Sequence, residues 1–348
     1  MKVASLFKKN SSNLDYSYVI AEIGHNHKGS LHIAKKLFEE AKKSGADAVK
    51  LQKRNNKILY TKNFYDSVYE NANSYGDTYG KHRDNLEFGK KEYKELILFA
   101  KKINIEFICT PFDVPSLNFL EDLNFPAYKI ASADLVNIPL QKKIAETMKP
   151  IFLSTGGGNF KDIERAYKNI TSINKRLAIL HCTASYPVDL KDMNLNVIKE
   201  LKKRYKKKLI GLSDHENGID AAPLAYMLGA RIFEKHFTLD RSWKGTDHSF
   251  SLEPAGLTKF VRNLKRVPIL LGNKNKKLLM SERKPLFKMI KSIVASNNIE
   301  KNTIIKFNHL SFKSPGGGLK PYEYKKILNK KTKIKILKDE KILPKNLK

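Results

Sequence analysis

The chain has 348 residues, of which 66 are Lys or Arg and 35 are Asp or Glu, so its formal net charge at neutral pH is +31. Its length and its 41% hydrophobic content suit one large α/β domain with a small appendage, or two ordinary domains. No apolar run approaches the roughly 18 residues of a membrane span, so we expect a soluble, cytoplasmic protein. Cys109 and Cys182 lie near the ends of expected buried strands, which favours free thiols over a disulfide.

The positive charge is spread along almost every expected helix and crowds the last residues of the chain. A nucleic-acid binding face would need a basic stripe interleaved with aromatic residues, and the sequence shows none. We therefore interpret the charge as a surface bias that attracts anionic metabolites, and nucleic acid is an unlikely partner. A polyanion-binding protein built on an inactive barrel is the non-enzymatic alternative.

From Tyr18 onward, short β-branched runs alternate with amphipathic helical ones, as in repeated βα units. Eight strands are expected, at residues 18–26, 48–52, 107–112, 128–134, 151–156, 177–187, 209–215 and 230–237. Eight such units close into a (β/α)8 TIM barrel, here over residues 1–272. In that fold the reacting groups lie at the C-terminal ends of the strands and in the loops that follow them.

Two stretches interrupt this pattern. Residues 53–89 are too many for an ordinary βα loop and lie on the expected catalytic face, which favours a lid or an oligomer contact. After Gly272, a charged linker over 273–290 leads to short β-branched runs divided by Asn, Gly and Pro. We expect residues 291–348 to form a small β-rich domain, near the size at which an isolated core is marginal.

Polar side chains stand at the C-terminal ends of all eight expected strands. In chain order they are Glu22 with His25 and Asn26, Lys50 with Gln52, Thr110 with Asp113, Lys129 with Ser132 and Asp134, Ser154 with Thr155, Thr183 with Tyr186, Ser213 with Asp214 and His215, and Glu234 with His236. A barrel built only for stability needs no such set at one mouth, so we predict one ligand site there. Lysines and hydroxyls suit a small ligand that carries phosphate and carboxylate.

His215 and His236 end two consecutive strands joined by a single helix, and such strands usually lie side by side, so the two imidazoles should converge. The plain alternative is that both rings are satisfied by hydrogen bonds at strand ends. Two protein ligands would leave positions open for water and substrate, as in a catalytic metal site. Such a metal polarises a carbonyl, and Glu22, Asp134 and Asp247 are then candidate proton carriers.

Seven segments carry a resemblance to a known family: AEIGHNHKGS, AVKLQ, CTPFD, AYKIASAD, ILHCTASYP, IGLSDH and EKHFTLDR. In this order and spacing they resemble the sialic acid synthase family, and the C-terminal segment is similar to the antifreeze-like (SAF) domain of that family. The resemblance implies a transferase that condenses phosphoenolpyruvate with an open-chain N-acyl hexosamine, such as N-acetylmannosamine, to a nine-carbon 2-keto acid and phosphate. Alternatives are a legionaminic or pseudaminic acid synthase and, against the SAF resemblance, a 3-deoxy-ulosonate phosphate synthase.

The resemblance also implies roles for individual residues and an assembly. The phosphate and carboxylate of phosphoenolpyruvate would be held by Lys50, Thr110, Lys129, Ser132, Ser154 and Ser213. Glu22 would transfer a proton, while Gln52, Tyr186 and Asp247 would face the sugar. His215 and His236 would hold a divalent metal, Mn2+ first, with Mg2+ or Co2+ as alternatives. The protein would be a domain-swapped homodimer in which each SAF domain caps the barrel of the partner subunit.

Three positions depart from the family's pattern. Ala184 stands where an Asn is frequent, so Ser185 or a water would have to supply that donor. Asp134 stands where Glu is common and is one methylene shorter. Ser314 stands where the SAF domain usually presents an Arg to the N-acyl group, and a neutral Ser cannot replace a forked cation. The amino sugar could therefore differ from N-acetylmannosamine.

Overall fold

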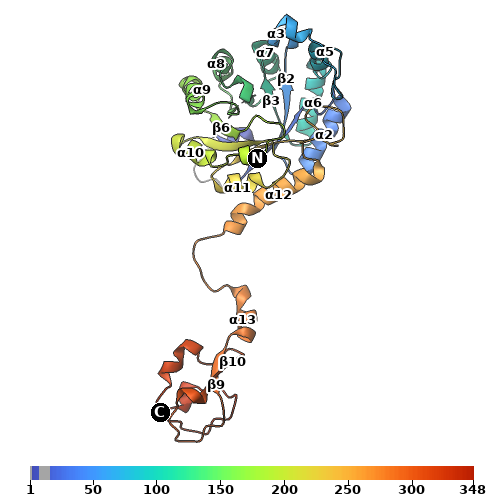
Figure 1. Cartoon of the computed structure of the whole chain (residues 1–348). Coiled ribbons are helices and arrows are strands. Elements are labelled where there is room, and N and C mark those ends of the chain that lie inside the picture. The colour runs from blue at the N-terminus through green and yellow to red at the C-terminus, as the bar shows by residue number, and fades with distance from the viewer. Residues whose placement is uncertain (1, 8–15) are drawn as a thin grey trace. The chain divides into compact units, whose positions relative to one another are not determined.

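Eight parallel strands close on one another in chain order in the computed structural model of the protein, which describes residues 2–7 and 16–348 (Figure 1). The strands are β1 (Tyr18–Gly24), β2 (Ala48–Lys53), β3 (Glu106–Pro111), β4 (Tyr128–Ile130), β5 (Ile151–Ser154), β6 (Leu177–Cys182), β7 (Leu209–Asp214) and β8 (Ile232–His236). The predicted TIM barrel is confirmed. Several strands end before their expected limits because the chain leaves the ladder early: after β4, the residues Ser132–Asp134 form a 3-10 turn.

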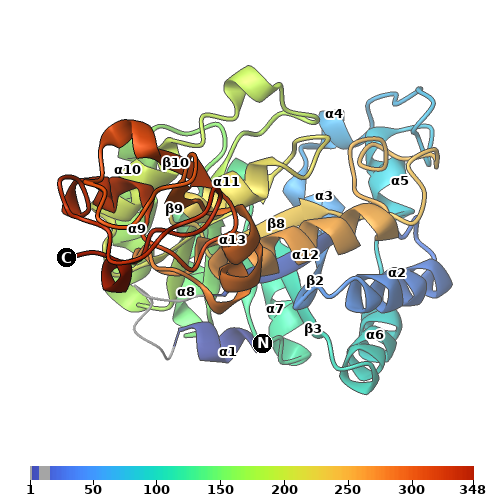
Figure 2. The ribbon, with the colours of Figure 1, turned by 90° about the horizontal axis from the view of Figure 1, so that it is seen from below.

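Helices surround the barrel in Figure 1. They are α2 (Leu31–Lys43), α6 (Lys90–Lys102), α7 (Val114–Asp122), α8 (Ile138–Glu146), α9 (Phe160–Ile173), α10 (Val197–Arg204), α11 (Ala221–Met227) and α12 (Pro254–Leu271). Side chains at Ser30, Asp113 and Asn137 accept hydrogen bonds from backbone N–H groups of the helices that follow. Each such N-cap contributes about 1 kcal/mol to stability. Figure 2 shows α2 between α6 and α12 on the outer wall, and α2 contacts both.

The inner face of the barrel changes from apolar to polar along the strands. Ile20 on β1 and Ile232 on β8 are buried in an apolar cluster at the N-terminal end of the barrel, and two residues further along the same strands are Glu22 and Glu234. The short helix α1 (Val3–Leu6) closes the apolar end, because both its terminal side chains are fully buried in that cluster. The polar groups of the interior therefore gather near the C-terminal mouth.

Residues 54–89, the first interruption of the pattern, fold into three short helices, α3 (Asn56–Leu59), α4 (Lys62–Tyr65) and α5 (Tyr79–Asp84). Aromatic rings hold them together: the ring of Tyr79 lies 5.1 Å from Tyr60, 4.5 Å from Phe64 and 5.2 Å from Tyr69 between centroids. Asn73 accepts a hydrogen bond of 3.0 Å from the backbone N–H of Gly245, in the loop after β8. The insertion is therefore fastened to the mouth of the barrel.

The chain divides into two compact units, Met1–Gly272 and Asn273–Lys348. The second contains η4 (Met280–Glu282), α13 (Arg283–Met289), the antiparallel pair β9 (Ser292–Ala295) and β10 (Leu310–Lys313), and three further 3-10 turns, η5 (Phe307–His309), η6 (Pro321–Lys326) and η7 (Pro344–Asn346). Isoleucines dominate its own small core. The stretch expected as a linker thus contains η4 and α13. Ser314 is exposed and donates its hydroxyl to the carbonyl of Met289 at 2.9 Å.

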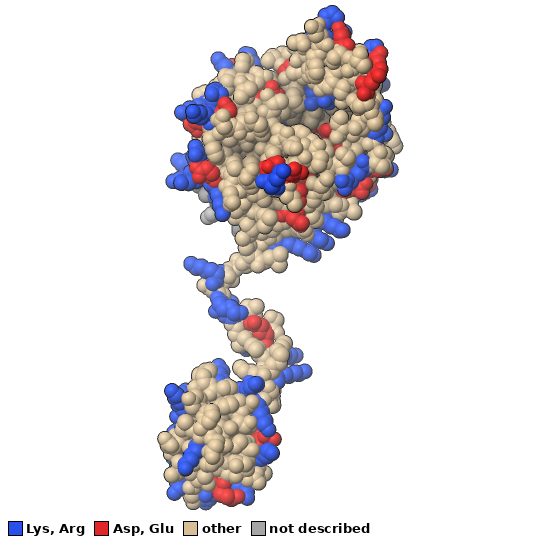
Figure 3. Space-filling model, in the orientation of Figure 1, with Lys and Arg blue, Asp and Glu red and all other residues tan. Residues whose placement is uncertain are grey.

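Surface properties follow the composition. On the face shown in Figure 3, Lys and Arg are scattered over both units and mixed with acidic residues rather than gathered into one stripe. Among the helices of residues 2–7 and 16–348, none combines the length and apolar character needed to cross a membrane. Cys109 and Cys182 are both buried free thiols, as predicted.

A buried ion pair on the helix-facing side of the strands gives a stability prediction. Lys235 Nζ lies 2.7 Å from Asp214 Oδ2, and the side chains are 1% and 0% exposed. Lys235→Met leaves the carboxylate buried and unpaired, so we expect the free energy of unfolding to fall by about 3–5 kcal/mol. Urea denaturation followed by circular dichroism measures the loss. The double variant Asp214→Asn/Lys235→Met should recover part of it, and wild-type stability of Lys235→Met would show that the pair is unimportant.

Candidate active site

A cavity of about 740 Å³ opens at the C-terminal mouth of the barrel. It is lined by nearly all of the site residues predicted from the sequence, namely Glu22, Lys50, Gln52, Thr110, Lys129, Ser132, Ser154, Tyr186, Ser213, His215, His236 and Asp247. They come from seven of the eight strands, or from the residues just after them, and from the loops after β6 and β8. Closure of the barrel therefore brings together groups that lie far apart in the sequence.

Two lysines are held in fixed positions by two carboxylates at the floor of the cavity. Lys50 Nζ lies 2.8 Å from Glu22 Oε2 and donates to Thr110 Oγ1 at 3.0 Å. Lys129 Nζ lies 3.1 Å from Glu234 Oε1, which also accepts a 3.0 Å hydrogen bond from Ser213 Oγ. All four charged side chains are at most 5% exposed. Buried charges of this kind persist only when paired, and here the pairs are complete.

The strand register explains why these groups meet. Glu22 is the ladder partner of Lys50 on β2 and of His236 on β8, and Ser213 on β7 is the partner of Glu234 on β8. Neighbouring positions of a parallel ladder point to the same face, so the side chains converge inside the barrel.

The same contacts shift the pKa values of the two carboxyl groups, Glu22 and Glu234, in opposite directions. Burial alone would raise the pKa of Glu234, but the ammonium groups of Lys129 and Lys50 lower it to about 2, so this carboxylate stays ionised. Burial raises the pKa of Glu22 above its ordinary value, Lys50 opposes the rise, and the Glu234 carboxylate adds to it. Two carboxyls whose pKa values are pushed apart suit one fixed charge and one proton carrier.

One wall of the cavity offers hydroxyls and backbone amides. Ser154 Oγ is buried and has no hydrogen-bond partner among the described residues. Ser132 Oγ accepts a 3.0 Å hydrogen bond from the backbone N–H of Gly156. A Cβ at Gly156 would lie 2.8 Å from that hydroxyl and 3.0 Å from the Cβ of Ala184, so only glycine fits. This wall can approach a phosphate closely.

The two predicted metal-binding imidazoles do converge. The rings of His215 and His236 lie 5.4 Å apart between centroids, and both line the cavity. His215 Nδ1 lies 2.8 Å from the carbonyl oxygen of Thr183, so that nitrogen carries the proton and Nε2 keeps its lone pair. His236 Nδ1 is buried without a hydrogen-bond partner, and burial lowers the pKa of this imidazole. Imidazole nitrogens with free lone pairs fit a divalent metal.

No cluster of three or more His, Cys, Asp or Glu side chains is arranged as metal ligands in residues 2–7 and 16–348. A metal here would therefore have two histidines as protein ligands and open positions for other oxygens. Asp247 Oδ2 lies 3.7 Å from His236 Nδ1. The ring of Tyr186, 54% exposed at the mouth, packs against His215 in a tilted arrangement with 4.1 Å between centroids. The side chains of Asp247, Tyr186 and Gln52 form a polar rim above the floor of the cavity.

Some polar strand ends serve the fold instead of the cavity. Asp113 caps α7 through the backbone N–H of Ser116, and Thr155 donates to the carbonyl of Leu180. Asp134 is not among the lining residues: its Oδ1 accepts from Asn137 Nδ2 at 2.8 Å, and burial raises its pKa. Ser185 donates its hydroxyl to the carbonyl of Pro187, so it does not replace the donor lost at Ala184. The expectation that one site uses every polar strand end is therefore too broad.

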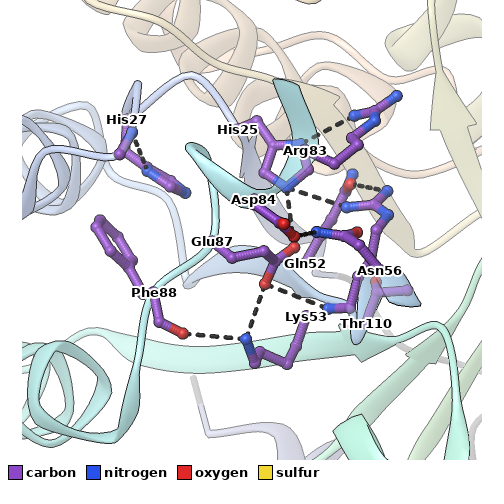
Figure 4. A network of polar contacts seen from close by, with 12 residues as sticks. His25, His27, Gln52, Lys53, Asn56, Arg83, Asp84, Glu87, Phe88 and Thr110 are labelled. Carbon is purple, nitrogen blue, oxygen red and sulfur yellow. Dashed lines mark hydrogen bonds and ion pairs between the residues drawn. The ribbon is translucent and has the colours of Figure 1, made fainter. Parts of the chain in front are cut away.

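Three charged residues of the cavity were not assigned to the site from the sequence. Glu234 was recognised as a polar strand end but given no role, although it anchors both lysines. Arg54 and Arg83 also line the cavity. Arg54 continues the alternation Lys50, Gln52, which places it on the same face and could have revealed it. No pattern in the sequence marks Arg83, which lies on α5 in the insertion and contacts the ring of His25 (Figure 4).

Comparison with known proteins gives matches along most of the chain. A model of the NeuB family matches residues 37–276, and a model of the SAF domain matches residues 290–348. The N-acetylneuraminate-9-phosphate synthase of Homo sapiens is 36% identical over 94% of this chain and 91% of its own length. The N,N'-diacetyllegionaminic acid synthase of Campylobacter jejuni is 38% identical over 90% of this chain and 94% of its own.

Among solved structures, an N-acetylneuraminic acid synthetase from Leptospira borgpetersenii in complex with citrate has a TM-score of 0.68 and 35% sequence identity. The match covers 78% of this chain and 90% of that one. The family models, the similar sequences and the similar solved structure therefore all indicate the same group of proteins.

Glu234 yields a prediction with a defined pH window. Its folded-state pKa of about 2 lies below the ordinary value of 4.5, so its contribution to stability is complete above pH 4.5 and is lost as the pH falls toward 2. Glu234→Gln should lower the free energy of unfolding at pH 7 by about 3–5 kcal/mol, because it leaves the buried ammonium group of Lys129 without its carboxylate. Urea midpoints between pH 7 and pH 3 measure this, and the gap between variant and wild type should narrow on acidification. A constant gap would contradict the assignment.

Proposed function

The chain belongs to the NeuB family of synthases, and we propose that it condenses phosphoenolpyruvate with an open-chain N-acyl hexosamine to give a nine-carbon 2-keto acid and inorganic phosphate. One observation carries the proposal: two lysines fixed by carboxylates lie in the same cavity as two converging imidazoles. The lysines and the hydroxyl wall suit the phosphate and carboxylate of phosphoenolpyruvate. The imidazoles suit the aldehyde end of the sugar.

A divalent metal, Mn2+ first, fits the nitrogen donors of His215 and His236. When bound it would act as a Lewis acid that polarises the aldehyde carbonyl. Lys50, Lys129, Ser132, Ser154 and Ser213 would orient phosphoenolpyruvate so that its C3 carbon faces the aldehyde carbon. Holding the two reactants in this orientation accounts for a large part of the rate acceleration, because no further entropy is lost in aligning them during the reaction.

Glu22 is placed to carry the proton. We propose that it takes up a proton when phosphoenolpyruvate engages Lys50, and gives this proton to the aldehyde oxygen while the C3 carbon of phosphoenolpyruvate forms the new bond to the aldehyde carbon. It then takes a proton from the water that adds at C2, and the tetrahedral adduct loses phosphate by cleavage of the C2–O bond. Its raised pKa favours both steps, and Gln52 orients it through a 2.7 Å hydrogen bond. Asp134 has no role here, because its carboxylate does not line the cavity.

The names of the relatives and the rim of the cavity indicate the class of acceptor sugar. Relatives are named as synthases of N-acetylneuraminate 9-phosphate, of diacetyllegionaminic acid and of pseudaminic acid. Gln52, Tyr186 and Asp247 form the polar rim that would face the sugar chain in each case. We propose N-acetylmannosamine or a close relative, with a legionaminic-type or pseudaminic-type acceptor as the alternative.

Mass spectrometry of products tests the reaction. The protein is incubated with Mn2+, phosphoenolpyruvate and each member of a panel of N-acyl hexosamines. We expect a nine-carbon 2-keto acid from at least one sugar, together with one phosphate per product. Absence of both from the whole panel would overturn the proposal.

The histidine pair gives a second prediction. His215→Ala or His236→Ala should lower phosphate release by at least about 1000-fold, as expected when a Lewis acid loses one of two protein ligands. Circular dichroism should show an unchanged fold. Calorimetric titration with Mn2+ should show weaker binding in both variants than in the wild type. Full activity in either variant would remove the metal from the mechanism.

The oligomeric state stays a prediction. We propose a homodimer, and light scattering coupled to size-exclusion chromatography should give twice the chain mass of 39.8 kDa. A monomeric mass at micromolar concentration would exclude it.

A further inference from the structure

Two arginines on the insertion side of the cavity have no carboxylate in direct contact among the described residues. The guanidinium of Arg54 is 3.8 Å above the ring of Phe112, and its Nη2 donates to Gln52 Oε1 at 2.5 Å. Arg83 donates to the hydroxyl of Tyr79, at 2.9 Å from Nη2 and 3.2 Å from Nε. Among the described residues, no Asp or Glu oxygen lies within 4.0 Å of either guanidinium. The two lysines at the floor, by contrast, are fully paired.

Both guanidinium groups contact the same imidazole. Arg54 Nη1 lies 3.0 Å from His25 Nε2, and Arg83 Nη1 lies 3.2 Å from His25 Nδ1. Figure 4 shows Arg83 beside the ring of His25. Burial and the two cations hold the pKa of His25 well below its usual range, so the ring is neutral and has one N–H and one lone pair. One of the two arginines must therefore face an N–H rather than an acceptor.

The neighbouring carboxylate decides which arginine lacks an acceptor. Glu87 Oε1 is buried without a hydrogen-bond partner and lies 3.5 Å from His25 Nε2. We assign the imidazole proton to Nε2, which points it at Glu87, and the lone pair on Nδ1 then accepts from Arg83. Arg54 Nη1 is left as a buried donor opposite another donor. A buried charged donor without an acceptor is costly, and an anion in the cavity would remove that cost.

Position along the strand indicates which part of a substrate would supply the anion. Lys50, Gln52 and Arg54 alternate on β2 and just beyond it, so they point to the same face. At about 3.3 Å per residue, Arg54 stands roughly 7 Å closer to the mouth than Gln52 and roughly 13 Å closer than Lys50. The floor takes phosphoenolpyruvate in the proposed function, so the arginines meet the end of the acceptor farthest from its aldehyde.

We propose that Arg54 and Arg83 bind the phosphate of an acceptor sugar that is phosphorylated on its terminal hydroxyl. The inference rests on the proposed function and names the substrate class of that site. Two guanidinium groups match the charge of a phosphate monoester dianion and can each bind it through paired N–H groups. The insertion over residues 54–89 then has a specific task, because α5 brings Arg83 to the cavity.

Steady-state kinetics with two acceptors test the inference. With Mn2+ and saturating phosphoenolpyruvate, kcat/KM is measured for N-acetylmannosamine and for N-acetylmannosamine 6-phosphate. We expect the wild type to prefer the phosphorylated sugar by about 100-fold or more, since charge-assisted hydrogen bonds of this type are each worth about 10-fold to 100-fold. Arg83→Gln should lose about 10-fold to 100-fold with the phosphorylated sugar and much less with the neutral one.

Lys81→Gln is the matched control. Lys81 lies on the same helix, is exposed and pairs with Asp77, so the variant removes the same charge without touching the cavity. It should keep the wild-type preference. Arg54→Lys, which keeps the charge but loses the fork, should lower kcat/KM more with the phosphorylated sugar than with the neutral one, so the preference should fall.

Three results would overturn the inference: equal or better use of the neutral sugar by the wild type, an unchanged preference in Arg83→Gln, or a rise in the KM for phosphoenolpyruvate alone. If neither of these two sugars is turned over, the inference can still be decided by binding. Calorimetry then compares the binding of both sugars to the wild type and to Arg83→Gln. Tighter binding of the 6-phosphate that disappears in the variant would support it, and equal binding would reject it.

Discussion

The carboxylate of Glu234 is the constraint on which the interior of the barrel depends. Its two oxygens face Lys129, Lys50 and Ser213, which come from three different strands. Without it, two ammonium groups buried close together at the floor would repel one another and be costly to keep charged. The Glu234 carboxylate, held in place by the fold, thus stabilises the two lysine ammonium groups next to the cavity where the substrate would bind. The cost of burying it is offset only because the pairs are complete.

The eight-stranded barrel could be predicted from the sequence because each βα unit repeats the same local signals. The two-residue period of a strand, which puts Glu22 and Glu234 on the inner faces of β1 and β8, and the positions of His215 and His236 at the ends of consecutive strands determine which side chains face the interior. Closure of the barrel brings those ends together. The floor of the candidate site followed from these rules, whereas the exact ends of strands such as β4 did not, because they depend on where the ladder gives way to a turn.

What the sequence could not reveal depends on contacts outside the repeating unit. Arg83 reaches the cavity through a helix whose position is set by aromatic packing among Tyr60, Phe64 and Tyr79, and no periodicity reports such packing. Asp134 shares its strand end with Ser132, yet the turn after β4 directs its carboxylate to Asn137 instead of the cavity. Polar type and strand position therefore identify candidates, and the local turn decides which of them meet the substrate.

The sealed lower end of the barrel has a kinetic consequence. Val3, Leu6, Tyr18 and Phe152 fill the interior beneath the paired lysines, so small molecules arrive and depart through the mouth. In the proposed reaction, phosphoenolpyruvate occupies the deepest layer and the sugar lies above it. The sugar would then block the way in, which imposes a compulsory sequence: the three-carbon substrate enters before the acceptor, and the long product leaves before the phosphate beneath it can escape.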